Sequence, residues 1–410
     1  MSTFRFIHAA DLHLGSPFAG LARADAESAE RFALATREAF SELVRRTIEL
    51  EAAFLVIAGD VYDGEWKDNS IGLFFARELA RLDRAGIRVV LLKGNHDADS
   101  VVTRTISLPE SVLQFASRKP STLRLDGLDV ALHGQSFAER AAPDNLARAY
   151  PAPVAGCFNI GVLHTSCAGY AAHEPYAPCS LDDLMLKGYD YWALGHVHEH
   201  EVLARDPWIV FPGCLQGRNV RECGPKGAAL VEVEDGRVRA VERLLVDRAR
   251  WASVEVDLSG VGDEPEALRL VERAVEPVAA AAEGRTVALR LTLSGATPLH
   301  GRFAADPRRL AAEAQAAAHR VEADLWLEEL KLRTGPPARA SEAAPELKSL
   351  DLSALMAGLD DDAEIRARVA DAVAAVANRL PSGIDAAGLA EELDGLIAEA
   401  RALALGRLGA

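Results

Sequence analysis

The 410-residue chain contains little cysteine and no long hydrophobic run. No apolar stretch approaches the roughly 20 residues that a helix needs to cross a bilayer, and residues 1–11 lack the apolar core of a signal peptide. An odd number of cysteines without a CxxC pair argues against a zinc ribbon or a disulfide framework and favours a reducing compartment. We therefore expect a cytoplasmic protein with no membrane contact. The five cysteines are Cys157, Cys167, Cys179, Cys214 and Cys223.

Positive charge is also scarce. The chain has 45 Lys and Arg against 61 Asp and Glu, a net charge of -16. This balance argues against a protein that binds nucleic acid mainly through an overall positive charge. The acidity is concentrated at the end of the chain, because residues 341–410 hold 13 acidic and 6 basic side chains. The hydrophobic fraction of 49% excludes wholesale disorder, and the length predicts two or three domains.

The order of apolar patterns predicts how these domains are arranged. Strand-like runs alternate with helical periodicity over residues 1–248, which predicts a layered α/β domain. Residues 249–334 show a strand–helix–strand–helix pattern typical of a small α+β domain. The composition of residues 335–345 is that of a linker. Residues 346–410 predict short amphipathic helices, and this acidic helical tail is a candidate for docking a partner.

Five apolar runs in the first domain end in the same way, with metal-ligand side chains directly after them. The carboxyl ends of strands in an open α/β sheet are where ligands bind, so we expect these side chains to converge. Alternate residues of an extended chain point the same way, which lets both members of a DxH or HxH pair reach one cation. The five endings are Asp11-Leu12-His13, Gly59-Asp60, Gly94-Asn95-His96-Asp97, His164 and Gly195-His196-Val197-His198.

This ligand inventory consists of imidazoles, carboxylates and one amide, without thiolate. Such a set favours manganese, iron or zinc over magnesium or calcium. About seven ligands are too many for one tetrahedral ion and enough for two ions that share a carboxylate. Two ions about 4 Å apart can clamp a phosphate ester and provide a nucleophile near neutral pH. The sequence therefore predicts two divalent metal ions, with manganese first and magnesium a further option.

These motifs, taken in order, resemble the calcineurin-like metallophosphoesterase superfamily, and most closely its SbcD-type DNA-repair exonuclease branch and the YhaO-like group. The resemblance covers residues 4–246 closely and implies a layered β-sandwich core flanked by helices, with residues 249–334 as a capping domain. It also implies a role for each matching residue. His96 is the general acid or charge stabiliser, and Asp97 supports it. Asp11, His13 and His198 hold the first metal; Asn95, His164 and His196 hold the second; Asp60 bridges the two.

Two positions depart from the pattern of the nuclease branch. Asp63 stands where related nucleases can carry a histidine, and Cys214 stands where they tend to have a polar residue. Three cations after the HxH motif, Arg218, Arg221 and Lys226, are candidates for contacts with the phosphate backbone of a substrate. A solvated loop is the equally weighted interpretation of these three side chains.

The leading functional hypothesis is a manganese-dependent hydrolase that acts as a nuclease subunit on DNA ends in DNA repair. The resemblance implies an SbcC-like coiled-coil ATPase as the partner of the C-terminal region, and a homodimer. A second hypothesis keeps the fold but takes a small molecule or cyclic nucleotide as the phosphodiesterase or phosphatase substrate. A third is an interaction scaffold with an idle site, against which the complete ligand set argues.

Overall fold

In the computed structural model, the chain divides into two compact units. Unit 1 comprises residues 1–252 and 282–288, and unit 2 comprises 253–281 and 289–410. The predicted linker at 335–345 and the predicted tail at 346–410 lie mostly outside the described residues. The structure describes residues 3–16, 26–63, 69–98, 107–125, 127–139, 142–167, 176–337, 366–371, 373, 395 and 397–400.

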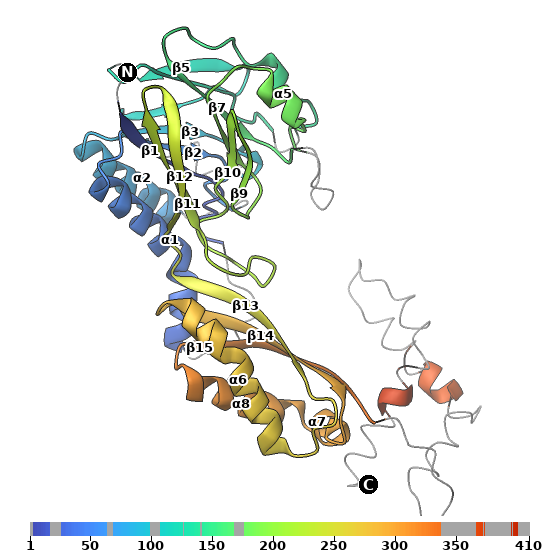
Figure 1. The fold of residues 1–410 in the computed structure, drawn as a ribbon. Coiled ribbons are helices and arrows are strands. Elements are labelled where there is room, and N and C mark those ends of the chain that lie inside the picture. Colours follow the sequence, from blue (N-terminus) through green and yellow to red (C-terminus); the bar gives the residue numbers. More distant parts are fainter. Residues whose placement is uncertain are drawn as a thin grey trace, which may run out of the picture. The chain divides into compact units, whose positions relative to one another are not determined.

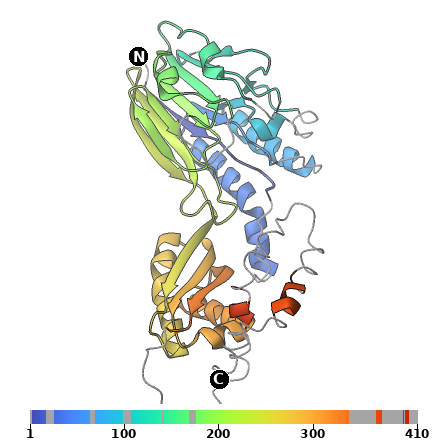
Figure 2. The same ribbon diagram turned by 90° about the vertical axis from the view of Figure 1, so that its right-hand side faces the viewer.

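Unit 1 contains two six-stranded sheets, drawn in Figures 1 and 2. In the first sheet the order is β12-β11-β1-β2-β3-β4, and the four strands from β1 to β4 are parallel. The late strand β11 pairs antiparallel with β1. The strands are β1 (Phe4–Ala9), β2 (Phe54–Ala58), β3 (Arg88–Leu92), β4 (Val112–Gln114), β11 (Gly227–Glu234) and β12 (Arg237–Leu245).

The second sheet has the order β5-β6-β7-β8-β10-β9. Its four inner strands, β6, β7, β8 and β10, are parallel, and the outer strands are antiparallel to their neighbours. The strands are β5 (Ser121–Leu125), β6 (Val130–Gly134), β7 (Phe158–His164), β8 (Tyr191–Gly195), β9 (Glu201–Arg205) and β10 (Trp208–Phe211).

The alternation of side chains along each strand explains the layers. One face of the first sheet packs against helices α1 (Ala26–Glu49) and α2 (Asn69–Arg84), which lie side by side in Figure 1. Its other face packs against the second sheet. The far face of the second sheet is covered by loops, the 3-10 turn η1 (Leu146–Ala149) and helix α5 (Leu181–Met185). The predicted α/β fold, a layered β-sandwich flanked by helices, is confirmed.

The third sheet has the order β13-β14-β15 and carries the helices of unit 2. The strand–helix pattern of the sequence predicts its first four main elements but not β15, which runs up to the Pro-rich segment. The elements are β13 (Ala249–Asp257), α6 (Glu264–Ala282), β14 (Thr286–Ala296), α7 (His300–Ala305), α8 (Pro307–Val321) and β15 (Leu325–Gly335). Among the described residues, none of the helices is both long and apolar enough to span a membrane.

Candidate dimetal centre

The carboxyl ends of β1, β2, β3, β7 and β8 bring the predicted ligands together. His164 is the last residue of β7, and Asn95 begins the short helix α3 (Asn95–Ala98) after β3. The loops after β1 and β2 are joined by hydrogen bonds from the Asp11 amide to the Gly59 carbonyl and from the His13 amide to the Asp60 carbonyl, both 3.0 Å. The Asp11 carboxylate in turn accepts the amide of His196, at 2.9 Å, from the second sheet. The chain turns so sharply here that Asp11, His13, Asp60 and His196 all have positive φ, a conformation that L residues rarely adopt.

The first group of ligand atoms comes from Asp11, His13 and His198. These atoms lie within 4.8 Å of one another. The Nε2 atoms of His13 and His198 are 3.2 Å apart, and the Nε2 atom of His198 is 3.7 Å from an oxygen of Asp11. The Nδ1 of His198 faces the Glu222 carboxylate at 2.7 Å, so its Nε2 lone pair points at His13. Two facing imidazole nitrogens beside a buried carboxylate fit a shared cation.

The second group comes from Asp60, His164 and Asn95. The Nδ1 of His164 donates to the Ala58 carbonyl at 2.9 Å, which leaves Nε2 to face the site. That atom lies 3.0 Å from the Asn95 amide oxygen and 3.4 Å from an oxygen of Asp60. The same Asp60 oxygen is 3.9 Å from Nε2 of His13, so it lies between the two groups. The ring of His196 packs edge-on against His164, with centroids 5.2 Å apart.

Two glycines permit this close approach. A Cβ on Gly94 would meet a carboxylate oxygen of Asp60 at 2.2 Å, and a Cβ on Gly195 would meet the Ala58 carbonyl at 2.1 Å. Real Cβ atoms do not approach other atoms so closely, and neither neighbour is a flexible chain end. The absence of a side chain at these positions is thus part of the construction of the site.

The buried carboxylates and imidazoles of the site shift one another's pKa values. Burial works against ionisation of Asp60, but His164 and its other histidine neighbours outweigh burial and lower the pKa of Asp60. Burial also works against protonation of His164, yet Asp60 and Asp11 raise its pKa to about 9. Burial raises the pKa of Asp11. The ionised Asp60 carboxylate therefore draws positive charge to this point, and divalent cations would satisfy the same field.

The comparisons with known proteins agree with this geometry. Residues 4–200 match the family model of the calcineurin-like phosphoesterases, and residues 251–335 match that of the middle domain of metallophosphoesterase YhaO. The uncharacterized metallophosphoesterase YhaO of Bacillus subtilis is 32% identical over 302 residues, which are 73% of each chain. The chain belongs to the calcineurin-like metallophosphoesterases, in the group of YhaO.

More distant members of the family carry names that refer to DNA or to nuclease activity. The DNA double-strand break repair protein Mre11 of Methanopyrus kandleri is 30% identical, over 66% of this chain and 62% of its own length. The SbcD component of the nuclease SbcCD of Escherichia coli K12 is 23% identical, over 66% of this chain and 75% of its own length. Family membership makes this protein a metal-dependent phosphoesterase.

The two predicted catalytic residues, His96 and Asp97, differ in their exposure to solvent. About a quarter of the His96 side chain is exposed, and its Nδ1 is 3.4 Å from a carboxylate oxygen of Asp63. Asp97 is buried, and its carboxylate accepts the amides of Val61, Tyr62 and Gly94. Asp97 therefore ties the loop after β2 to the loop after β3. Burial and the nearby charge of Asp60 raise the pKa of Asp97 to about 7.

Sequence reasoning missed the carboxylate that anchors His198. Glu222 is buried and receives both the Nδ1 of His198 and the guanidinium of Arg218, the latter at 2.9 Å. Arg218 also lies 3.4 Å from a carboxylate oxygen of Asp63. The Ser16 hydroxyl donates to the same oxygen at 2.5 Å. The spacing of Arg218 and Glu222, four residues apart in one loop, was the only local signal for this network.

The three cations singled out from the sequence occupy different settings. Arg218 is engaged by Glu222 and Asp63. Lys226 is buried and pairs with Glu199, with the His198 carbonyl 3.3 Å away. Arg221 alone has an exposed side chain. Two of the three therefore serve the internal charge balance around His198. Cys214 is buried beside this network, and its sulfur belongs to a cluster with His198 and Glu222.

Proposed function

We propose that this metallophosphoesterase is a two-metal DNA nuclease subunit that acts on DNA ends in DNA repair. The observation that carries the proposal is the convergence of two ligand groups, with an Asp60 oxygen between them, at the carboxyl ends of five strands. Its relatives include proteins named for DNA break repair and for nuclease activity, which favours DNA as the substrate.

In this proposal Asp11, His13 and His198 hold one cation, Asn95, His164 and His196 hold the other, and Asp60 contributes to both. Two bound cations supply Lewis-acid polarisation of the phosphate and a nucleophile near neutral pH. Manganese suits the mixed nitrogen and oxygen ligands, and iron, zinc or magnesium are the alternatives to be compared. Second-layer contacts orient the rings: Glu222 holds His198, and the Ala58 carbonyl holds His164.

His96 is placed to act on the substrate. Its Nε2 is 4.0 Å from an oxygen of Asp60, which puts the ring at the edge of the ligand groups, and its partial exposure leaves it accessible. We assign it proton donation to the leaving oxygen and stabilisation of phosphate charge. Asp97 acts as a positioning residue, because its hydrogen bonds hold the short helix α3 (Asn95–Ala98), which carries His96.

The remaining parts of the chain are assigned by the same proposal. Residues 1–248 form the nuclease domain and residues 249–334 a capping domain. The acidic C-terminal region docks an SbcC-like coiled-coil ATPase. We further propose a cytoplasmic homodimer.

The test is digestion of end-labelled single- and double-stranded DNA with each divalent metal. We expect cleavage with manganese and at least a hundredfold loss in a His96→Ala variant, which is the typical size of a general acid contribution. A His319→Ala variant, which makes the same change in unit 2, should keep full activity. Failure to cleave DNA with any metal would refute the nuclease proposal.

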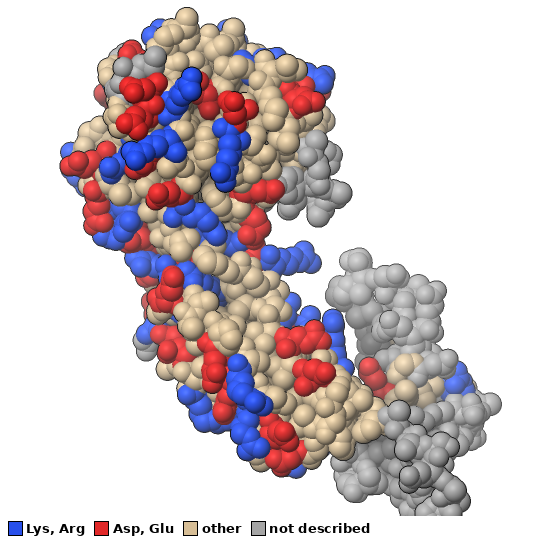
Figure 3. Space-filling model, in the orientation of Figure 1, with Lys and Arg blue, Asp and Glu red and all other residues tan. Residues whose placement is uncertain are grey.

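A second candidate is a phosphodiesterase for small nucleotides. The observation that favours it is the net charge of -16, together with a surface on which acidic and basic side chains are interspersed in the face drawn in Figure 3. Faster turnover of a small diester than of any DNA would select this candidate. An idle scaffold, the third alternative, would hydrolyse neither.

A further inference from the structure

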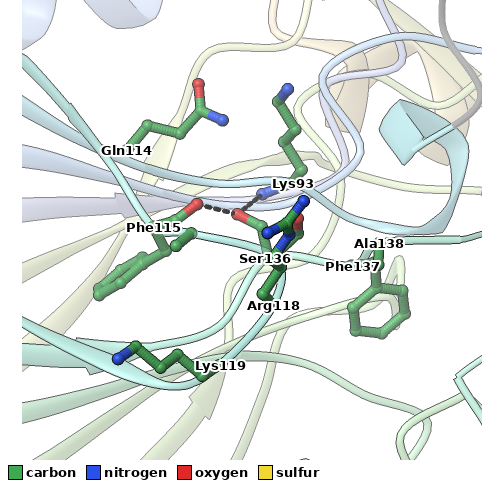
Figure 4. A pocket seen from close by; sticks show the side chains of 10 residues that line it. Lys93, Gln114, Phe115, Arg118, Lys119, Ser136, Phe137 and Ala138 are labelled. Carbon is green, nitrogen blue, oxygen red and sulfur yellow. Dashed lines mark hydrogen bonds between the residues drawn. The ribbon is translucent and has the colours of Figure 1, made fainter.

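A cavity of about 690 Å³ lies in unit 1 where the loops after β3, β4 and β6 meet. Its volume is in the range of ligand pockets. Three of the residues that line it are basic: Lys93 from the loop after β3, and Arg118 and Lys119 from the loop after β4 (Figure 4). The lining includes neither aspartate nor glutamate.

The three cations differ from the other basic residues near the metal centre. Arg218 and Lys226 are both paired with carboxylates. Within the described part of the chain, no ion pair joins Lys93, Arg118 or Lys119 to an acidic side chain. In a chain with 61 acidic residues, three such cations around one cavity form a local site for an anion.

The cavity adjoins the metal centre through rigid contacts. Lys93 comes two residues before Asn95, so their Cα atoms are at most about 7 Å apart. The Phe137 amide donates to the Lys93 carbonyl at 3.0 Å, and the Phe137 ring packs edge-on against His164 with centroids 5.7 Å apart. The buried Ser136 hydroxyl donates to the Phe115 carbonyl at 2.8 Å and accepts the Lys93 amide at 3.1 Å, as Figure 4 shows.

The chemistry of the cavity follows from these contacts. The Ser136 hydroxyl joins all three loops, so the cavity is held in place relative to the ligand loop. Lysine and arginine bind phosphate oxygens through charge-assisted hydrogen bonds. Lys93 and Asn95 belong to one short segment, so a strand whose phosphate is at the metal centre can reach this cavity with another of its phosphates.

We propose that this cationic cavity, lined by Lys93, Arg118 and Lys119, binds a second phosphate of a nucleic-acid strand whose neighbouring phosphate is at the metal centre. The inference rests on the proposed nuclease function and deepens it, because it makes a strand with several phosphates a better substrate than an isolated diester. It also explains how an acidic protein holds a strand, since the required positive charge is local.

The test uses the full chain with Arg118→Glu and Lys119→Glu combined. The matched control combines Arg84→Glu and Arg88→Glu, which make the same change in net charge on exposed side chains. Arg88 begins β3 and Lys93 follows its end, so Arg88 lies at the opposite end of this strand, about 16 Å away. Binding of a fluorescent oligothymidylate is measured by anisotropy in EDTA at several salt concentrations, and hydrolysis of bis(4-nitrophenyl) phosphate is measured with manganese.

We expect the cavity variant to bind the oligonucleotide at least tenfold more weakly at low salt, and its salt slope to fall by about 0.7 for each phosphate that the protein no longer neutralises. Hydrolysis of the small diester, which has a single phosphate, should match the wild type. A Lys93→Met variant should weaken binding in the same direction. The control variant should match the wild type in both assays, and all variants should keep the wild-type circular dichroism spectrum.

Binding by the cavity variant that equals the control would overturn the proposal, even if the wild type cleaves DNA. Conversely, the wild type could bind the strand through these residues but cleave only small diesters. That result would refute the nuclease function and support strand binding by the cationic cavity. Competition with pyrophosphate distinguishes a strand from a small ligand. Displacement of the oligonucleotide by pyrophosphate at equal phosphate concentration would overturn the assignment to a strand.

Discussion

Replacement of Glu222 by glutamine is the most informative single perturbation of the metal centre. The change keeps the shape of the side chain and removes its negative charge. In the native protein the Glu222 carboxylate lies 2.7 Å from Nδ1 of His198 and 2.9 Å from the Arg218 guanidinium. The neighbouring His198 and Arg218 outweigh the cost of burial and hold the pKa of Glu222 well below its usual range, so the residue is ionised at neutral pH.

The expected magnitude follows from the two roles of this carboxylate. It orients His198 and makes the ring more basic, and it compensates the charge of Arg218, which would otherwise repel a cation. Loss of such a second-layer partner typically weakens metal affinity by 10- to 100-fold, which corresponds to about 1.4 to 2.7 kcal/mol. The loss should affect the metal bound by Asp11, His13 and His198 more than the other.

The assay is a titration of phosphodiesterase activity with manganese, together with calorimetric titration of the metal into EDTA-treated protein. The variant should need 10- to 100-fold more metal for half-maximal activity and should recover much of its rate at saturation. Glu234→Gln, an exposed change on β11, serves as the control. Unchanged metal affinity in a folded Glu222→Gln protein would refute the reasoning that this carboxylate tunes His198.

Three further predictions concern the fold and the metals. Burial lowers the pKa of His8 to about 3. The free energy of unfolding should therefore fall as pH drops below about 6.5, by at most about 1.4 kcal/mol per pH unit. Urea titrations at several pH values should show a weaker dependence of this free energy on pH in His8→Gln. Gly94→Ala should lower activity at least tenfold while the protein stays folded, because the new Cβ meets Asp60. In the control Gly335→Ala the new Cβ meets open space, and activity should be unchanged. Unchanged activity in Gly94→Ala would contradict this account of the packing. Chelation should abolish hydrolysis reversibly, and activity that persists in EDTA after dialysis would exclude a metal requirement.

The parallel strands and the convergence of the candidate ligands could be predicted from the sequence because each strand is a short apolar run with a polar ending. Asp11, Asp60 and His164 each follow such a run, and the rule that parallel strands end at one edge brings them together. Two further histidines in strands of unit 1 are not part of the site: His8 is buried between the Tyr191 hydroxyl and the Leu194 carbonyl, and His133 stacks on Tyr189.

The supporting contacts could not be predicted in the same way. Arg218 and Lys226 look like free cations in the sequence, since nothing local shows that Glu222 and Glu199 neutralise them in the folded chain. The cavity could not be predicted either, because the loops after β3 and β4, which carry Lys93 and Arg118, are closed off by Ser136 and Phe137, which follow a strand of the other sheet. Patterns identify an element and its ends, whereas charge pairing depends on which loops become neighbours in three dimensions.

The position of β11 beside β1 has a consequence for synthesis and for truncation. Strand β1 receives its second neighbour only when Gly227–Glu234 has been made, which is after the last candidate ligand, His198. Until then the edge of β1 is unpaired and open to wrong partners. A fragment that ends at residue 200, where the phosphoesterase family match stops, would carry every proposed metal ligand and still lack strand β11, which pairs with β1. The shortest piece that can mature into an enzyme should therefore extend through β12, whose last residue is Leu245.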